Sequence, residues 1–178
     1  METPDTRNLI DKYKGLTNES IVADLDKTRI PLEVAIENLA HDFNIGTIIR
    51  NANAFNVRTV HIIGKRKYNR RGAMVTDKYL HIKHWPTVTD FVTDARKRCQ
   101  QLVAIENNCP NTKPLQQAKF KSNTTLIFGS ESDGISEELL KSADKIYHIE
   151  QLGSTRSINV GCASAVAMYE FVRTRQLV

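Results

Sequence analysis

The stretch TTLIFGSESDG, residues 124–134, decides the fold class, because an apolar strand-like run passes directly into a turn of glycine, serine and acidic residues. Two further stretches have the same character, NLAHDFNIGTIIR at 38–50 and GSTRSINV at 153–160. Each places Gly, Asn, Ser or a charge between a strand-like run and a helix-like run. α/β proteins bind ligands at such junctions, where helix N-termini offer free N–H donors. The three stretches therefore predict one composite pocket.

Strand-like and helix-like runs alternate along the rest of the chain. The apolar pattern predicts strands at 32–36, 59–63, 80–85, 102–105, 125–128 and 145–149. It predicts helices at 44–55, from Thr87 to Cys99, after Ser136 and at 158–173. This alternation predicts an α/β fold with a mostly parallel sheet and helices on both faces. Residues 1–30 are polar, and Thr17 is a candidate helix N-cap, so we expect a helical N-terminal extension before a core domain at 31–178.

Length and composition limit the class of protein. A chain of 178 residues with 40% hydrophobic content is long enough for one domain with a buried core. No run approaches a membrane span, and the first residues lack the pattern of a signal peptide. The three cysteines, Cys99, Cys109 and Cys162, have no metal-ligand spacing, so we expect buried or inert thiols in the cytoplasm, no metal and no membrane partner. The net charge of +5 is compatible with a polyanionic partner.

The content, order and spacing of the three stretches resemble the SPOUT class of RNA methyltransferases, and within it the SpoU/TrmH family, which methylates ribose 2′-hydroxyls. The resemblance covers roughly residues 31–175. It implies S-adenosylmethionine as the cofactor, a homodimer, and a deep C-terminal trefoil knot within roughly residues 120–170. Periodicity does not show a knot, and the general rules of chain connection argue against one, so this expectation rests on the resemblance alone.

The same resemblance implies a set of catalytic residues: Arg50, Asn44, Glu131, Ser157 and Asn159. Because a guanidinium stays protonated in proteins, we expect Arg50 to hold an RNA phosphate and stabilise the developing alkoxide rather than to act as a base. Simpler roles stay open for most of them. Arg50 can be a surface arginine, Glu131 a solvated loop acid, and Asn44 and Ser157 helix N-caps.

The cofactor positions implied by the family are Ile105, Gly129, Ile149, Leu152, Ser157 and Ile158. Core packing is the alternative role of Ile149 and Ile158. The sequence departs from the family pattern at Glu150, where Pro is usual, at Gly161, where Ser is usual, and at Asn56, where Gly is usual. The small residues of the last helix allow close packing, either against a second copy of the chain or within one chain.

The run KRKYNRR at 65–71 follows an expected strand and concentrates basic side chains around a tyrosine. Basic groups neutralise phosphates and tyrosine stacks on unpaired bases, so we expect this loop and Arg156 to bind RNA. The residues are Lys65, Arg66, Lys67, Tyr68, Arg70, Arg71 and Arg156. A solvated charge run is the alternative.

These patterns predict an S-adenosylmethionine-dependent RNA 2′-O-methyltransferase. We expect tRNA as the substrate, because Arg156-Ser157-x-Asn159 resembles relatives that methylate a guanosine in the tRNA D-loop. An rRNA methyltransferase is the alternative enzyme. A catalytically silent RNA-binding protein of the same fold is the alternative from another class. A nucleotide-binding oxidoreductase is disfavoured, because the glycines at 129 and 134 do not form a dinucleotide fingerprint.

Overall fold

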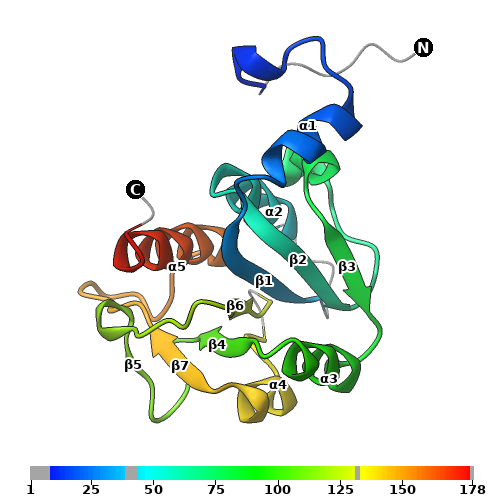
Figure 1. The fold of residues 1–178 in the computed structure, drawn as a ribbon. Helices are drawn as coiled ribbons and strands as arrows, with labels where there is room; N and C mark the ends of the chain where they lie inside the picture. The colour runs from blue at the N-terminus through cyan, green and yellow to red at the C-terminus, as the bar shows by residue number, and fades with distance from the viewer. Residues whose placement is uncertain (1–8, 39–43, 131–132, 177–178) are drawn as a thin grey trace.

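A computed structural model describes residues 9–38, 44–130 and 133–176. Its centre is a seven-stranded sheet in the order β3-β2-β1-β6-β4-β7-β5 (Figure 1). Every pairing between neighbouring strands is parallel. The strands are β1 (Ile30–Asn38), β2 (Val57–Gly64), β3 (Ile82–Trp85), β4 (Gln101–Ile105), β5 (Lys113–Pro114), β6 (Thr124–Phe128) and β7 (Lys145–His148). The predicted α/β fold with a parallel sheet is therefore confirmed.

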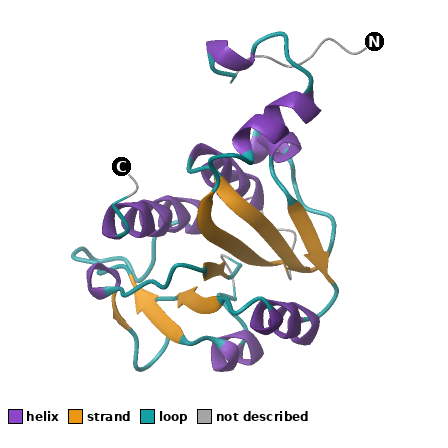
Figure 2. Cartoon of the chain, viewed as in Figure 1, coloured by secondary structure: helices purple, strands orange, loops and turns teal. Residues whose placement is uncertain are grey.

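Helices cover both faces of this sheet (Figure 2). On one face lie α2 (Asn44–Ala54) and α5 (Val160–Thr174), and on the other lie α3 (Val88–Lys97) and α4 (Glu137–Ser142). Strand β1 shows how the sequence divides the core, because side chains alternate along a strand. Leu32, Val34 and Ile36 belong to the apolar cluster under α2 and α5, whereas Ala35 belongs to the cluster under α3 and α4.

The predicted helix starts are correct at three of the caps. The side chains of Thr17, Thr87 and Ser136 each accept a hydrogen bond from a backbone N–H three residues further on. The last helix begins at Val160, two residues later than its apolar pattern predicts. Its cap is Asn159 and not Ser157, because the Asn159 side chain accepts from the Cys162 amide at 3.2 Å.

The N-terminal extension consists of η1 (Asp11–Tyr13) and α1 (Asn18–Leu25), and it docks beside η3 (Thr76–Tyr79) at the top of Figure 1. Tyr13, Ile21 and Tyr79 form its small apolar core. Asn56 links this region to the sheet. Its φ of 49° accounts for glycine being usual there, and its side-chain amide donates to the carbonyl of Leu25 at 3.2 Å.

The three cysteines differ in their exposure. We expected thiols that are either buried or inert. Cys99 and Cys162 are exposed and Cys109 is half-buried, so burial is wrong for the first two, and inert thiols stay a prediction. Within the described part of the chain, no helix is long and apolar enough to cross a membrane. The same residues contain no group of three or more His, Cys, Asp or Glu side chains placed to hold a metal ion.

Candidate active site

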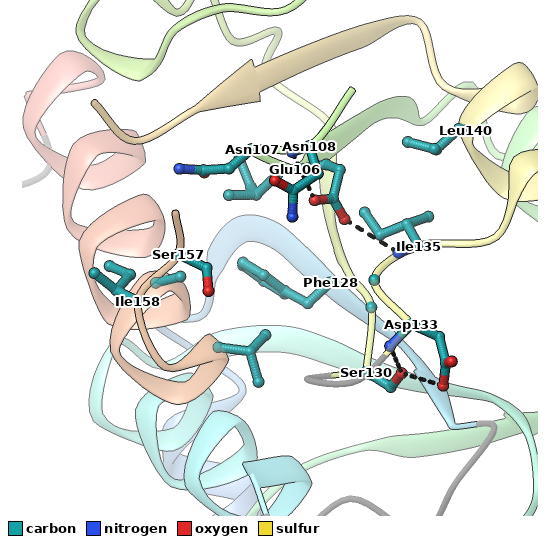
Figure 3. A pocket seen from close by; sticks show the side chains of 15 residues that line it. Glu106, Asn107, Asn108, Phe128, Ser130, Asp133, Ile135, Leu140, Ser157 and Ile158 are labelled. Carbon is teal, nitrogen blue, oxygen red and sulfur yellow. Dashed lines mark hydrogen bonds between the residues drawn. The ribbon is translucent and has the colours of Figure 1, made fainter. Parts of the chain in front are cut away.

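A cavity of about 210 Å³ lies at the carboxyl edge of the sheet, where parallel strands place their ligand sites (Figure 3). Three segments form it: the turn after β4, the loop after β6 and the approach to α5. Two of the three predicted stretches therefore meet here, and the third is attached beside them. The described lining residues are Ile105, Glu106, Asn107, Asn108, Phe128, Gly129, Ser130, Asp133, Gly134, Ile135, Leu140, Ser157, Ile158, Val160 and Ala163.

The loop after β6 is a tight turn that requires glycine. Ser130 and Gly134 exchange two backbone hydrogen bonds, at 3.0 and 3.1 Å. A Cβ at Gly129 would lie 2.0 Å from the carbonyl carbon of Gly134, so no other residue fits without moving the backbone. Gly134 has a φ of +67°, which also favours glycine. Glu131 lies within this turn but outside the described residues.

The turn after β4 is hydrogen-bonded to the segments that follow β6 and β7. The sequence patterns did not predict this turn as part of the site. The carboxylate of Glu106 accepts the amide N–H groups of Ile135 and Asn108, both at 3.1 Å. The side-chain amide of Asn107 donates to the carbonyl of Ile149 at 2.9 Å. These contacts join the ends of β4, β6 and β7. Three polar residues directly after a buried strand were the available signal, because ligand sites gather at that end of a parallel sheet.

Asn44 and Asn159 join the first predicted stretch to the third. The Asn159 side-chain amide donates to Oδ1 of Asn44 at 2.8 Å, while Oδ1 of Asn159 caps α5. Asn44 is the first residue of α2, so the pair fixes the starts of two helices beside the cavity. A Cβ at Gly161 would lie 2.8 Å from Thr47, which explains a glycine where the family usually has serine. Close packing within one chain therefore accounts for this small residue.

The positions expected around the cofactor divide into two groups. Ile105, Gly129, Ser157 and Ile158 line the cavity. Ile149 is next to it, because its backbone is held by Asn107, but its side chain packs against the core. Leu152 is 97% exposed and does not line the cavity. The departure at Glu150 leaves the cavity unobstructed, since this side chain bonds Gln116.

Arg50 does not line this cavity. It is exposed on α2, on the wall of a separate groove of about 370 Å³ that faces the N-terminal extension. Leu9, Tyr13 and Ile21 form the apolar wall of that groove. Within one chain, Arg50 and Ser157 therefore line different cavities, although Arg50 lies on the same helix as Asn44.

The basic loop at 65–71 is anchored at both ends. The side-chain amide of Asn38 donates to the carbonyls of Lys65 and Lys67, at 2.6 and 3.0 Å. At the other end, Nε of Arg70 donates to the buried carboxylate of Asp77 at 2.7 Å. Tyr68 is half-buried against the core, and burial raises the pKa of its hydroxyl. The basic side chains of the loop are Lys65, Arg66, Lys67, Arg70 and Arg71, and Arg156 is exposed elsewhere on the surface.

Comparisons with known proteins identify the family of this chain. The model of the SpoU rRNA Methylase family matches residues 31–169. The tRNA (guanosine(18)-2′-O)-methyltransferase of Escherichia coli K12 is 30% identical over 148 residues, a match that covers 82% of this chain and 64% of that protein. The chain thus spans slightly less than two thirds of the length of this relative.

Solved structures show the same fold. The TrmH/SpoU tRNA modifying enzyme of A. aeolicus superposes with a TM-score of 0.78 at 24% identity, covering 90% of this chain and 83% of that one. An AdoMet-bound rRNA methyltransferase of Sinorhizobium meliloti superposes with a TM-score of 0.74 at 23% identity, covering 86% and 60%. Because the family model matches most of the chain, the protein belongs to the SpoU rRNA methylase family.

Proposed function

We propose that this protein is an S-adenosylmethionine-dependent RNA ribose 2′-O-methyltransferase. One observation carries the proposal: the cavity at the carboxyl edge of the sheet is bounded by Ser157 and lies beside the Asn44–Asn159 pair. A ligand cavity and a rigid pair of amides are thereby placed side by side. Methyl transfer to a hydroxyl depends chiefly on such positioning.

The residues of the cavity fit S-adenosylmethionine. Phe128, Ile135 and Ile158 offer apolar surface for a flat base, and Asn107 and Ser130 offer polar groups for a ribose and an amino acid moiety. Gly129 keeps the backbone close without a side chain in the way. We assign cofactor binding to Ile105, Gly129, Ser157 and Ile158, to the backbone of Ile149, and to Leu152 as a residue that covers the ligand. The bound cofactor would supply an electrophilic methyl group.

The protein groups around the hydroxyl would bind and orient the RNA. Asn44 and Asn159 hold the target ribose, Glu131 supports them, and Arg50 binds the adjacent phosphate. Lys65, Arg66, Lys67, Arg71 and Arg156 neutralise further phosphates, while Arg70 secures the loop through Asp77. We favour tRNA because the E. coli relative named above is a tRNA methyltransferase. An rRNA substrate is the second candidate, in view of the S. meliloti neighbour.

We also propose a homodimer, which would bring Arg50 of one copy to the cavity of the other. On α5, Cys162, Val166 and Tyr169 form an exposed stripe, and the last two are 44% and 54% exposed. This helix packs against α2, since the Asn51 amide donates to the carbonyl of Gly161 at 2.8 Å. A second copy on the stripe would lie close to the helix that carries Arg50.

Mixed dimers test this arrangement. Arg50→Ala and Asn159→Ala are each expected to inactivate the enzyme when every subunit carries the change. Mixing and refolding the two variants should restore about a quarter of the wild-type rate, since half of the chains enter mixed dimers and each mixed dimer has one intact site. If the mixture stays inactive although mixed dimers form, Arg50 acts within its own chain.

The remaining assignments are proposals of the same kind. We propose a trefoil knot within roughly residues 120–170, an extension at 1–30, and a cytoplasmic location. The knot is what membership of the SpoU rRNA methylase family implies, and the match of the family model to residues 31–169 includes nearly all of this part of the chain. Mechanical stretching from the two termini tests it. A knotted chain stops short of its full contour length, and an unknotted chain reaches it.

Mapping ribose methylation in cellular RNA tests the function itself. RNA from cells with and without the protein should differ at one or a few 2′-O-methyl positions, in tRNA if the favoured substrate is correct. A difference in rRNA would select the second candidate. Identical maps, together with RNA binding by the purified protein, would instead identify a catalytically silent RNA-binding protein.

A further inference from the structure

Glu106 is the least expected residue of the cavity. It follows the last residue of β4, and its carboxylate lies between the turn after β4 and the loop at 129–135 (Figure 3). The two hydrogen bonds from Ile135 and Asn108 hold one carboxylate oxygen each. A carboxylate has about four acceptor sites, so the bonds to the backbone fix its position without using its full capacity.

The charged side chains among the described lining residues of the cavity are carboxylates. Asp133 is a second carboxylate on its wall, within hydrogen-bonding distance of Ser130, at 3.3 Å. Among the described residues that line the cavity there is no Lys, Arg or His. Glu106 is half-buried, and charges interact more strongly there than in bulk water. The cavity therefore favours a ligand with a net positive charge.

This asymmetry matters because the two ligands of a methyltransferase differ in charge. S-adenosylmethionine carries a sulfonium and an ammonium against one carboxylate, so its net charge is positive. Transfer of the methyl group breaks the S–CH₃ bond, forms an O–CH₃ bond, and leaves a neutral thioether in S-adenosylhomocysteine, while the hydroxyl proton leaves to an acceptor outside the cavity. The product then lacks the charge that the wall attracts.

We propose that Glu106 is a specificity-determining residue, whose fixed negative charge makes the cavity prefer S-adenosylmethionine over S-adenosylhomocysteine and so favours release of the spent cofactor. The proposal rests on the proposed function of the cavity and adds a role for a residue outside the three predicted stretches. If Glu106 acted only by holding the loops through these hydrogen bonds, its loss would change the affinity for both ligands by the same factor. A difference between the ligands is therefore the property that separates a charge effect from a structural one.

Calorimetric titration of the full-length protein with each ligand tests the proposal. Glu106→Gln should weaken S-adenosylmethionine binding on the order of 5- to 20-fold relative to its effect on S-adenosylhomocysteine. Glu106→Asp keeps the charge on a shorter side chain, so it should weaken both ligands and leave their affinity ratio within about twofold of wild type. Glu19→Gln, an exposed change of the same charge on α1, should alter neither affinity.

The outcomes separate the two proposals. If wild-type protein binds neither ligand, the proposed function fails. If both ligands bind and Glu106→Gln lowers their affinities by the same factor, the function stands and the role of Glu106 is refuted. If Glu106→Gln does not fold, salt titration of the wild type decides. Added salt should weaken S-adenosylmethionine more than S-adenosylhomocysteine, and equal weakening would overturn the proposal.

Discussion

The face of the sheet under α3 and the carboxyl edge of the sheet both contain polar side chains, but the two regions use them differently. On the face under α3, His61 is fully buried, and its Nε2 lies 2.9 Å from a carboxylate oxygen of Glu33. The same oxygen accepts a hydrogen bond from Arg98 at 2.6 Å. Trp85 donates to Nδ1 of His61 at 2.9 Å. At the carboxyl edge, Glu106, Asn107 and Ser157 border open space.

The difference shows which polar residues are structural and which are available for chemistry. Because Trp85 donates to Nδ1, the proton of neutral His61 is on Nε2 and is donated to Glu33. The network thus uses the polar atoms of His61 on protein partners, as stable buried networks require. The edge residues hold loops with some of their polar groups and line the cavity. Mutations in the buried network should therefore change stability, and mutations at the carboxyl edge should change ligand binding or rate.

Substitution of Arg50 is expected to have the largest effect, and the quantity affected is the rate of methyl transfer at saturating RNA. If the guanidinium stabilises charge as the hydroxyl loses its proton, Arg50→Ala should slow single-turnover methyl transfer roughly 10²–10³-fold. Arg50→Lys should rescue little, because an ammonium cannot make a bidentate bond to phosphate. Affinity for S-adenosylmethionine should stay near wild type, since the proposed partner of Arg50 is an RNA phosphate and not the cofactor. A wild-type rate for Arg50→Ala at saturating RNA would show that Arg50 is a surface or binding residue with no role in the methyl-transfer step.

Glu33 is expected to give the next largest effect, on stability alone. Glu33→Gln leaves the cation of Arg98 with a weaker partner in a mostly buried site, and it should lower the free energy of unfolding by roughly 2–3 kcal/mol. The rate per folded molecule should not change. Urea unfolding with parallel activity measurements separates an effect on stability from an effect on rate, and a loss of rate without a loss of stability would contradict the assignment.

The same network predicts a dependence on pH. Burial by itself would raise the pKa of Glu33, but hydrogen bonds from His61 and Arg98 outweigh it, so this pKa lies below its ordinary value. A carboxyl with a lowered pKa stabilises the fold above its unfolded pKa, and this contribution is lost as pH falls through the folded value. The stability gap between wild type and Glu33→Gln should therefore narrow below about pH 4. A gap that is constant down to about pH 3 would argue against the ion pair.

Gly129 provides a smaller and more local test. An alanine Cβ at this position would meet the backbone of Gly134, whereas at Gly153 it would meet nothing within 4 Å. Gly129→Ala should weaken cofactor binding by about 1–3 kcal/mol, a loss of roughly 5- to 150-fold, and Gly153→Ala should leave it unchanged. Equal affinities for the two variants would show that the turn is not part of the cofactor site.

The basic loop should give the smallest effect at low salt. Neutralising Lys65, Arg66 and Lys67 should weaken RNA binding and lower the slope of log affinity against log salt by about 0.7–0.9 for each phosphate that the loop no longer neutralises. Cofactor affinity should not respond. The triple variant Lys78→Gln, Lys83→Gln and Lys97→Gln, on exposed lysines outside the loop, controls for the change in net charge. An unaltered slope in the loop variant would mean that the loop is only solvated.

Individual helices were predicted from the sequence, because the spacing of apolar residues and the N-cap residues that define a helix lie within the helix or directly beside it. The spacing of Ile45, Ile48, Ile49 and Ala52 predicted α2, and all four are buried. Thr87 and Ser136 predicted helix starts through their own side-chain bonds. The order of strands in the sheet was not predicted, because pairing of β1 with β6 joins segments about ninety residues apart and leaves no local pattern.

The candidate site was predicted in part for the same reason. Gly129, Ser157 and Ile158 belong to stretches with a visible pattern, and they line the cavity. The position of Arg50 on a different groove depends on how α2 lies against its neighbours, which spacing along one helix cannot reveal. Glu106 was not predicted, because an acidic residue after a strand is common at protein surfaces. Its position directly after a predicted strand was the signal that could have identified it.

Methyl transfer to purified, unmodified tRNA tests the central claim most directly. Wild-type protein with methyl-labelled S-adenosylmethionine should place label on a ribose 2′-hydroxyl, and digestion should release a 2′-O-methylated nucleoside. Asn159→Ala, which removes the bond to Asn44, should lose most of this transfer, while Glu33→Gln should keep it at a temperature where it is folded. Absence of ribose label from both tRNA and rRNA, with folded wild-type protein, would contradict the account.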